Sequence, residues 1–186
     1  MSQRLKYTRT DSCSEAASQS VPPTPNVPIR SAVMPQDTWS EGKRFGGREV
    51  PLGVLGGAEQ VGVNLMELAP GKQSCPFHWH LREEEHFFVL HGRCVLRSGD
   101  DRFVMEPGDY VCFPAGTRVG HAFENPFAEA CQLMAIGTRD ADEIAVYPDS
   151  GKAKLRALGH ILRYPSDTLD YWDDELVDVP IGHGHE

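Results

Sequence analysis

Histidines and acidic residues come together in one short part of the sequence. His78 and His80 flank Trp79. Side chains two positions apart in a strand leave the same face, so both imidazoles would face one side and Trp79 the other. Two imidazoles on one face can bind a single metal ion. The first acidic side chains able to join them are Glu84 and Glu85, which follow a short turn.

The choice between these two acidic residues depends on the register of the next strand. Glu85 begins an apolar run that ends at Leu90 and that must form a strand. A carboxylate at the start of a strand is held in a fixed direction, so we predict Glu85 as the ligand. Alternation then turns His86 outward, while Phe87 and Val89 share the inward direction of Glu85 and are expected to be core.

A third histidine, His121, follows the Pro114–Gly116 turn and the apolar run Tyr110–Phe113, so a neighbouring strand can deliver it. The predicted metal ligands are therefore His78, His80, Glu85 and His121. This set suits iron, manganese, nickel, cobalt, copper or zinc, and does not suit magnesium or calcium, which prefer oxygen ligands. Positions left open on the ion would bind substrate or dioxygen. No organic cofactor is indicated, and no catalytic residue is assigned.

Other residues with metal-binding or redox potential have simpler interpretations. Cys75 and Cys112 lie near the expected site, but a free cysteine is usually a small buried apolar residue. His183 and His185 repeat the spacing of a histidine pair in a glycine-rich terminal segment without a carboxylate partner, so we expect only adventitious metal binding there. Asn125 is expected to support the loop that follows the His121 strand.

The residues from Gln60 to Thr138 have the pattern of a β protein. Short apolar or alternating runs are separated by Gly, Pro or Asp turn signals. The expected strands are Val61–Leu68, Gln73–His80, Glu85–Leu90, Cys94–Ser98, Arg102–Met105, Tyr110–Phe113, Gly120–Glu124 and Glu129–Ile136. No internal helix is expected. The fold class is therefore all-β and antiparallel, and periodicity leaves open a sandwich or a closed barrel.

The two ends of the chain differ from this central part. Residues 1–36 are rich in Ser and Pro and are predicted to form a flexible arm. Residues 37–140 are predicted to form the barrel. Residues 141–186 are acidic and are expected to form an irregular extension packed on the barrel, with a disordered tail, because they are too few for a second core.

Composition excludes several classes of function. Eighteen Lys and Arg against twenty-seven Asp and Glu give a net charge of -9, which argues against nucleic-acid and membrane partners. Five cysteines without a Cys-x-x-Cys pair indicate neither a disulfide framework nor a zinc knuckle. No apolar stretch is long enough for a membrane span, and the first residues lack a secretory signal. We therefore expect a cytoplasmic protein.

Two segments resemble the sequence motifs of the cupin superfamily. The segment from Gly71 to Gly92 is similar to the first motif: a glycine, His-x-His, four residues, a glutamate, six residues and a glycine. The segment from Gly108 to Asn125 is similar to the second: a glycine, five residues, Pro-x-Gly, a histidine and, after three residues, an asparagine. Two loops depart from the motifs, since one residue is added before His78 and two are added before His121.

The resemblance implies a double-stranded β-helix, also called a jelly roll, that holds one divalent metal ion on the four predicted ligands. Further segments resemble small single-domain bacterial cupins of unknown reaction, among them Arg44–Gly47, Gly62–Leu65 and Tyr147–Lys152. Because cupin barrels commonly pair through edge strands, the resemblance also implies a homodimer.

Two functions from different classes follow from these features. The first is a metalloenzyme acting on a small organic molecule, with dioxygenase, an oxidoreductase activity, as the first choice. Isomerase or lyase chemistry is the alternative reaction, with Glu84 as a candidate base. The second function is a non-catalytic cupin that binds or senses a sugar or metabolite.

Overall fold

The computed structural model describes residues 22–164, which form thirteen strands and very little helix. In chain order the strands are β1 (Asp37–Glu41), β2 (Phe45–Val50), β3 (Val61–Leu68), β4 (Trp79–His80), β5 (Glu85–His91), β6 (Cys94–Ser98), β7 (Asp101–Met105), β8 (Tyr110–Phe113), β9 (His121–Glu124), β10 (Cys131–Thr138), β11 (Ile144–Tyr147), β12 (Lys152–Leu155) and β13 (His160–Arg163). One helical turn, α1 (Leu52–Leu55), lies beside β3, and 3-10 turns occupy Ser31–Val33, Pro148–Ser150 and Arg156–Leu158.

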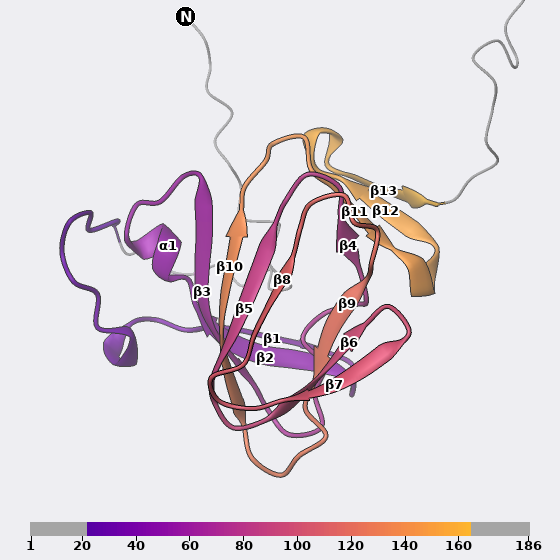
Figure 1. Ribbon diagram of the computed structural model, residues 1–186. Helices are drawn as coiled ribbons and strands as arrows, with labels where there is room; N and C mark the ends of the chain where they lie inside the picture. The colour runs from indigo at the N-terminus through magenta and orange to yellow at the C-terminus, as the bar shows by residue number, and fades with distance from the viewer. Residues whose placement is uncertain (1–21, 165–186) are drawn as a thin grey trace, which may run out of the picture.

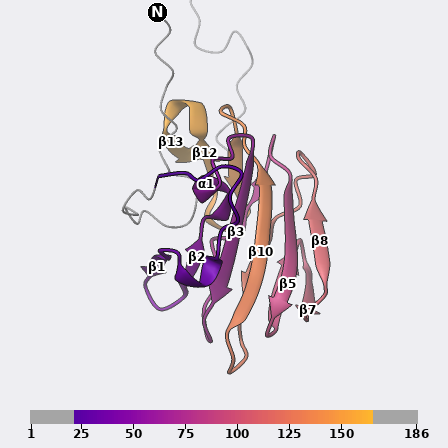
Figure 2. The same ribbon diagram turned by 90° about the vertical axis from the view of Figure 1, so that its left-hand side faces the viewer.

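The strands form three antiparallel sheets, and the six-stranded and three-stranded sheets enclose the main core (Figure 1). Six strands follow one another in the order β1-β2-β3-β10-β5-β8, and Figure 2 shows this wall from outside. The facing wall consists of a three-stranded sheet, β7-β6-β9, and a four-stranded sheet, β13-β12-β11-β4. This is the antiparallel jelly-roll barrel that the sequence predicts.

Strand alternation explains how the barrel is filled. In β5, Phe87 and Val89 point inward and are buried, whereas Phe88 between them is exposed. The inward residues pack against others from both walls, such as Leu133 of β10 and Phe123 of β9. Burying these large apolar side chains is the main force that holds the two walls together. The same alternation directs Glu85, two positions before Phe87, toward the barrel interior.

Most predicted strands occur within two residues of their expected ends, and one does not. The expected strand Gln73–His80 is reduced to β4, with single bridges at Gln73 and His78. Pro76 interrupts this stretch because proline has no N–H to donate to a strand ladder. The short helix α1 was also not expected.

The C-terminal extension is more regular than the sequence suggests. Residues 144–163 form β11, β12 and β13, so the expectation of an irregular segment is wrong for this part. These strands join β4, and a small core forms where Trp79 packs on Val146 and Ala153. The turn between β11 and β12 is possible because Gly151 adopts a φ of +57°, which favours glycine.

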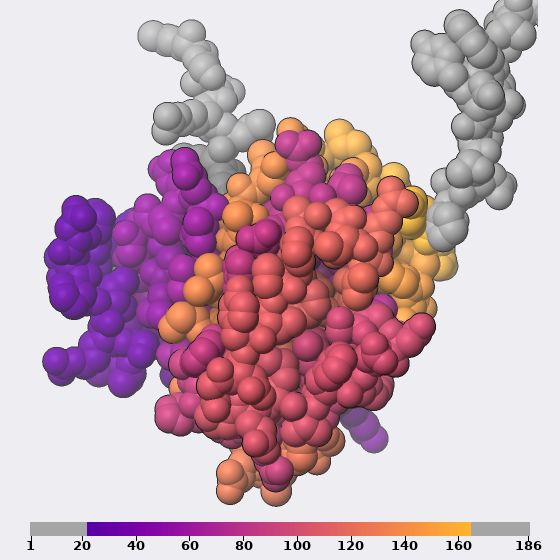
Figure 3. Space-filling model, in the orientation of Figure 1, coloured from indigo at the N-terminus to yellow at the C-terminus, as the bar shows by residue number. Residues whose placement is uncertain are grey.

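The four-stranded sheet lies on the side of the molecule opposite α1 and the first described residues, which are indigo (Figures 1 and 3). The domain boundaries near 37 and 140 stay predictions. Residues up to 21, and those from 165 onward with His183 and His185, lie outside the described residues, as do most of the predicted arm and tail. In the part of the chain that is described, no helix is both long and apolar enough to cross a bilayer.

Candidate metal centre

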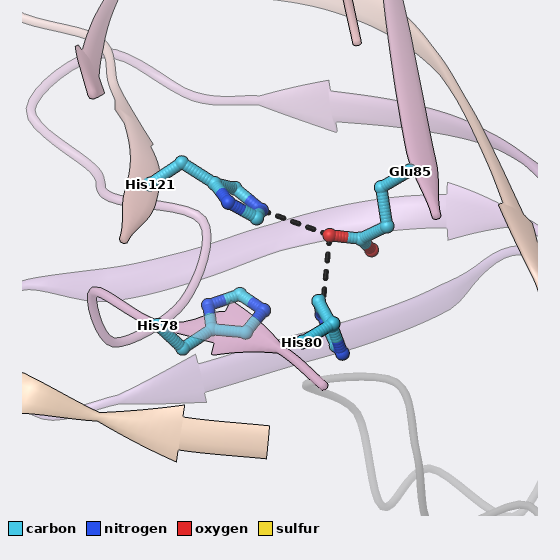
Figure 4. Close-up of side chains that lie close together, drawn as sticks. All are labelled: His78, His80, Glu85 and His121. Atoms are coloured by element: carbon cyan, nitrogen blue, oxygen red, sulfur yellow. Dashed lines mark hydrogen bonds and ion pairs between the residues drawn. The ribbon is translucent and has the colours of Figure 1, made fainter. Parts of the chain in front are cut away.

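The four predicted ligands lie together inside the barrel, although they come from three different parts of the chain (Figure 4). One ligand atom from each of His78, His80, Glu85 and His121 lies within 4.8 Å of all the others. Glu85 Oε2 is 2.8 Å from His121 Nε2 and 3.1 Å from His80 Nε2. The structure thus brings together all four residues, while metal binding by them stays a prediction.

Backbone pairing between two segments positions two of the histidines. The amide of His78 donates to the carbonyl of His121 at 3.2 Å, and the amide of His121 donates back at 2.8 Å. The His121 ring is buried and stacks on Phe113, with 3.9 Å between ring centroids and 12° between planes. The longer loop before His121 therefore does not misdirect it.

Hydrogen bonds at the far side of two rings decide which nitrogen faces the centre. His78 Nδ1 donates to the carbonyl of Pro76 at 2.8 Å, and His80 Nδ1 donates to Glu143 Oε1 at 3.1 Å. Each ring then carries its proton on Nδ1 and keeps the Nε2 lone pair for a metal, an arrangement typical of metal-binding histidines. His80 Nε2 is buried and faces the carboxylate of Glu85, another predicted ligand, at 3.1 Å.

Glu143 is a site residue that sequence reasoning missed. Its carboxylate is almost fully buried. Besides the bond from His80, it accepts backbone amide hydrogen bonds from Leu81 at 3.0 Å and from Arg82 and Glu83 at 2.8 Å each. The one signal for it in the sequence is an acidic residue directly before an apolar run, which is too common to identify a functional residue.

A buried ion pair holds the β4–β5 turn against the extension. Glu83, which is buried, accepts two hydrogen bonds from the guanidinium of Arg156, one of them 2.8 Å long. It also accepts the amide N–H of Asp140 at 2.7 Å. The turn that leads into Glu85 is therefore attached to the C-terminal extension by two buried carboxylates, Glu83 and Glu143.

The charges at the centre stabilise each other. Burial alone would raise the pKa of Glu85, but His80 and His121 hold the pKa well below its usual range. Burial alone would lower the pKa of His80, but the carboxylates of Glu85 and Glu143 outweigh burial and raise the pKa to about 10. In the absence of metal, an imidazolium at His80 thus neutralises the ionised Glu85.

The neighbours of Glu85 face the other side of the sheet. Glu84 Oε1 accepts a hydrogen bond from His86 Nε2 at 2.9 Å, and His86 Nδ1 is 2.6 Å from the hydroxyl of Tyr110. With Cys112 nearby, these side chains form a separate polar group outside the barrel. The register therefore places Glu85, and not Glu84, beside the histidines.

Two other residues singled out in the sequence have clear places. Cys75 Sγ is 3.6 Å from His78 Nδ1, so it lies on the side of the ring that faces away from the centre. Asn125 is buried, donates to the carbonyls of Leu68 and Glu129, and accepts from the amide of Phe127. It supports the loop after β9, as the sequence predicts.

The centre lies between two hollows. The larger is a cavity of about 650 Å³ that His78 and His80 line together with residues of β1, β11 and β12. The smaller has about 240 Å³ and is lined by Glu85 and residues of β3 and β10. Ligand sites for small molecules usually have volumes of roughly 300–1,000 Å³, so the larger cavity is the candidate substrate site.

The residues present fit a divalent transition metal. Three imidazoles and one carboxylate converge, two of the imidazoles are held in the metal-binding tautomer, and a buried nitrogen of His80 faces the carboxylate of Glu85. Nitrogen-rich sets of this kind suit the metals that the sequence predicts, and their identity stays open.

Comparisons with known proteins agree with this architecture. The sequence model described as the cupin domain matches residues 64–137. No curated protein matches the sequence. One similar solved structure is a sugar phosphate isomerase of the cupin superfamily from Silicibacter pomeroyi, with 35% identity and a TM-score of 0.62, covering 67% of this chain and 81% of that one.

Two more solved structures are similar to different degrees. A protein from Acidithiobacillus ferrooxidans, provisionally named a sugar phosphate isomerase, has 28% identity and a TM-score of 0.65, covering 70% of this chain and 85% of its own. A predicted oxalate decarboxylase from Thermotoga maritima, with 20% identity and a TM-score of 0.53, covers 60% of this chain and 98% of its own. This last likeness shows the fold alone.

Proposed function

This chain belongs to the cupin superfamily, and we propose that it is a metal-dependent isomerase of a small hydroxy-carbonyl compound such as a sugar phosphate. The observation that carries the proposal is that His78 and His80 line a cavity large enough for such a compound. The names of the proteins from Silicibacter pomeroyi and Acidithiobacillus ferrooxidans support the choice of reaction.

Interconversion of an aldose and a ketose moves one proton between neighbouring carbons and one between neighbouring oxygens, so it needs no oxidant. The bound metal would act as a Lewis acid toward the carbonyl and hydroxyl oxygens of the substrate. The residues proposed to hold it are His78, His80, Glu85 and His121. Glu143 keeps the His80 ring in the required tautomer.

Proton transfer requires a side chain in the cavity wall. The ring of Tyr147 stacks on that of His78, with 5.6 Å between centroids, and Tyr147 lines the larger cavity. We propose Tyr147 as the group that carries the proton at oxygen. Glu84, the base suggested by the sequence, does not face this cavity because its carboxylate bonds to His86.

The other sequence-based predictions stay open. No finding favours a dioxygenase over an isomerase, and the non-catalytic sensor is an outcome of the test below. We retain as proposals a small-molecule ligand without nucleic-acid or membrane partners, a homodimer and a cytoplasmic location.

The test uses protein purified without a metal-affinity tag or chelator. Metal content is measured first, and the loaded protein is then incubated with aldose phosphates in deuterated water. We expect one bound metal ion per chain, ketose formation and deuterium at the carbon beside the carbonyl, with most of the metal and of the activity lost in His80→Ala and Glu85→Gln.

Two results would contradict the proposal. Oxygen consumption with diketones, catechols or flavonols, without isomerisation of any sugar phosphate, would indicate a dioxygenase. A folded protein that takes up no metal and binds a sugar unchanged would indicate a sensor.

A further inference from the structure

One face of the four-stranded sheet carries one predicted metal ligand, His80, and two lysines. In the register of this sheet, His80 of β4 lies opposite Ala145 of β11, and Ala145 lies opposite Lys154 of β12. One step along, Tyr147 lies opposite Lys152. Directly paired residues in antiparallel strands point to the same face, so the two lysines point to the same face as His80.

This face borders the larger cavity. Lys152 and Lys154 line it together with His78 and His80. Neighbouring strands lie about 4.8 Å apart, so the backbone at Lys154 is roughly 10 Å from the backbone at His80. Between these two residues lies Ala145, whose small methyl group leaves space for an elongated molecule with one end at His80 and the other at Lys154.

The charges along the cavity wall favour an anion at the lysine end. The chain as a whole carries a net charge of -9, yet within residues 22–164 the cavity is lined by Lys152, Lys154 and Arg156 against one carboxylate, that of Glu41. Glu83 accepts hydrogen bonds from Arg156, and the two lysines add further positive charge to this wall. Lys152 Nζ also lies 5.2 Å from the centre of the Tyr147 ring.

We propose that Lys152 and Lys154 form a subsite for the phosphate group of a substrate whose hydroxy-carbonyl end lies at the metal centre. Two ammonium groups match the charge of a phosphate monoester better than that of a single carboxylate. The identity of the metal-bound end rests on the proposed isomerase function, whereas the anion subsite depends on the lysines alone.

The test measures binding of three compounds by calorimetry: glucose 6-phosphate, glucose and glucuronate. The variants are Lys154→Met, Lys152→Met and the double variant. The control is Arg93→Met. This variant removes one positive charge just beyond the last residue of β5, roughly 20 Å from Glu85 at the first residue of that strand. All proteins are compared with and without metal, so that direct binding of phosphate to the ion is separated from binding to the lysines.

We expect wild-type protein to prefer glucose 6-phosphate over both glucose and glucuronate, with or without metal. A charge-assisted hydrogen bond corresponds to an affinity change of about tenfold to a hundredfold. Each single variant should therefore weaken binding of glucose 6-phosphate about tenfold or more, and the double variant should abolish the preference. Arg93→Met should bind all three compounds as wild type does.

Two outcomes would overturn the subsite: a wild-type protein with no preference for the phosphate, or a preference that the double variant retains. The first measurement needs no variant, so the proposal remains testable if a variant fails to fold. Equal affinity for glucuronate and glucose 6-phosphate would show a site that accepts carboxylates in general, and would also refute the phosphate subsite. A lysine-dependent preference without isomerase activity would support the subsite while refuting the proposed function.

Discussion

Replacing Glu143 by glutamine should weaken metal binding although Glu143 is not a predicted ligand. The carboxylate accepts four hydrogen bonds, two on each oxygen: Oε1 from His80 Nδ1 and the amide of Leu81, and Oε2 from the amides of Arg82 and Glu83. In Glu143→Gln one of these oxygens becomes an NH₂ group. If Oε2 is replaced, the amides of Arg82 and Glu83 both lose their acceptor. If Oε1 is replaced, His80 Nδ1–H loses its acceptor, whereas the amide of Leu81 keeps the carbonyl of Ile144 at 3.0 Å.

The magnitude follows from these four bonds. A buried N–H without a partner costs about 1–3 kcal/mol, and the less costly orientation leaves one such group, so the free energy of unfolding should fall by about 1–3 kcal/mol. If the NH₂ group faces His80, it donates to Nδ1 and moves the ring proton to Nε2, the nitrogen that the metal needs. Loss of such a supporting carboxylate typically weakens metal affinity about 10–100-fold, which equals about 1.4–2.8 kcal/mol.

The assay is competition with a chelator of known affinity, combined with thermal unfolding of the metal-free protein. A double-mutant cycle with His80→Ala separates direct from general effects. Because Glu143 acts through His80, Glu143→Gln should cause little further loss of affinity in the His80→Ala background. Unchanged affinity in the single variant, or an equal loss in both backgrounds, would refute this reasoning.

Three further predictions concern the centre and its support. Glu85→Gln should lose most of the bound metal, measured by elemental analysis, whereas Glu84→Gln should keep it; the reverse result would contradict the register of β5. Burial lowers the pKa of His80, but Glu85 and Glu143 raise it to about 10, so metal uptake at pH 8 should release about one proton. Metal affinity should therefore rise about tenfold per pH unit from pH 7 to pH 9. Calorimetry in buffers of different ionisation enthalpy measures the released proton, and metal uptake without proton release would contradict this prediction. Asn125→Ala should lower the free energy of unfolding in urea by about 2–4 kcal/mol without changing metal affinity, because its three hydrogen bonds hold the loop after β9.

Local sequence signals predict most of the barrel. The strands between Val61 and Thr138 are bounded by Gly, Pro and Asp turns, and alternation within each strand is enough to assign inward and outward faces. The prediction failed at Gln73–His80, where Pro76 breaks the ladder in a segment that otherwise alternates. It also failed in residues 144–163, whose strands become stable only when β11 pairs with β4 and covers Trp79.

The candidate site also contains residues that the sequence predicts and residues that it does not. His78 and His80 are predictable because one extended segment presents both, and Glu85 follows from the parity of the next strand. Glu143 is 63 residues from His80, and Lys154 reaches the cavity only through the pairing of three strands. No spacing in the sequence reports contacts of this kind, since they depend on which strands become neighbours after folding.

This division explains why the family resemblance indicates a metal but not a reaction. The matched cupin domain spans residues 64–137 and contains all four predicted ligands. Glu143, Tyr147, Lys152 and Lys154 all follow it; Glu143 orients His80, and the other three line the cavity beside His78 and His80. Because a cupin centre can serve several reactions, the groups that face the substrate must select among them. In this chain the extension supplies part of the cavity wall, including its two lysines, so substitutions in β11 and β12 should change substrate choice while leaving the metal in place.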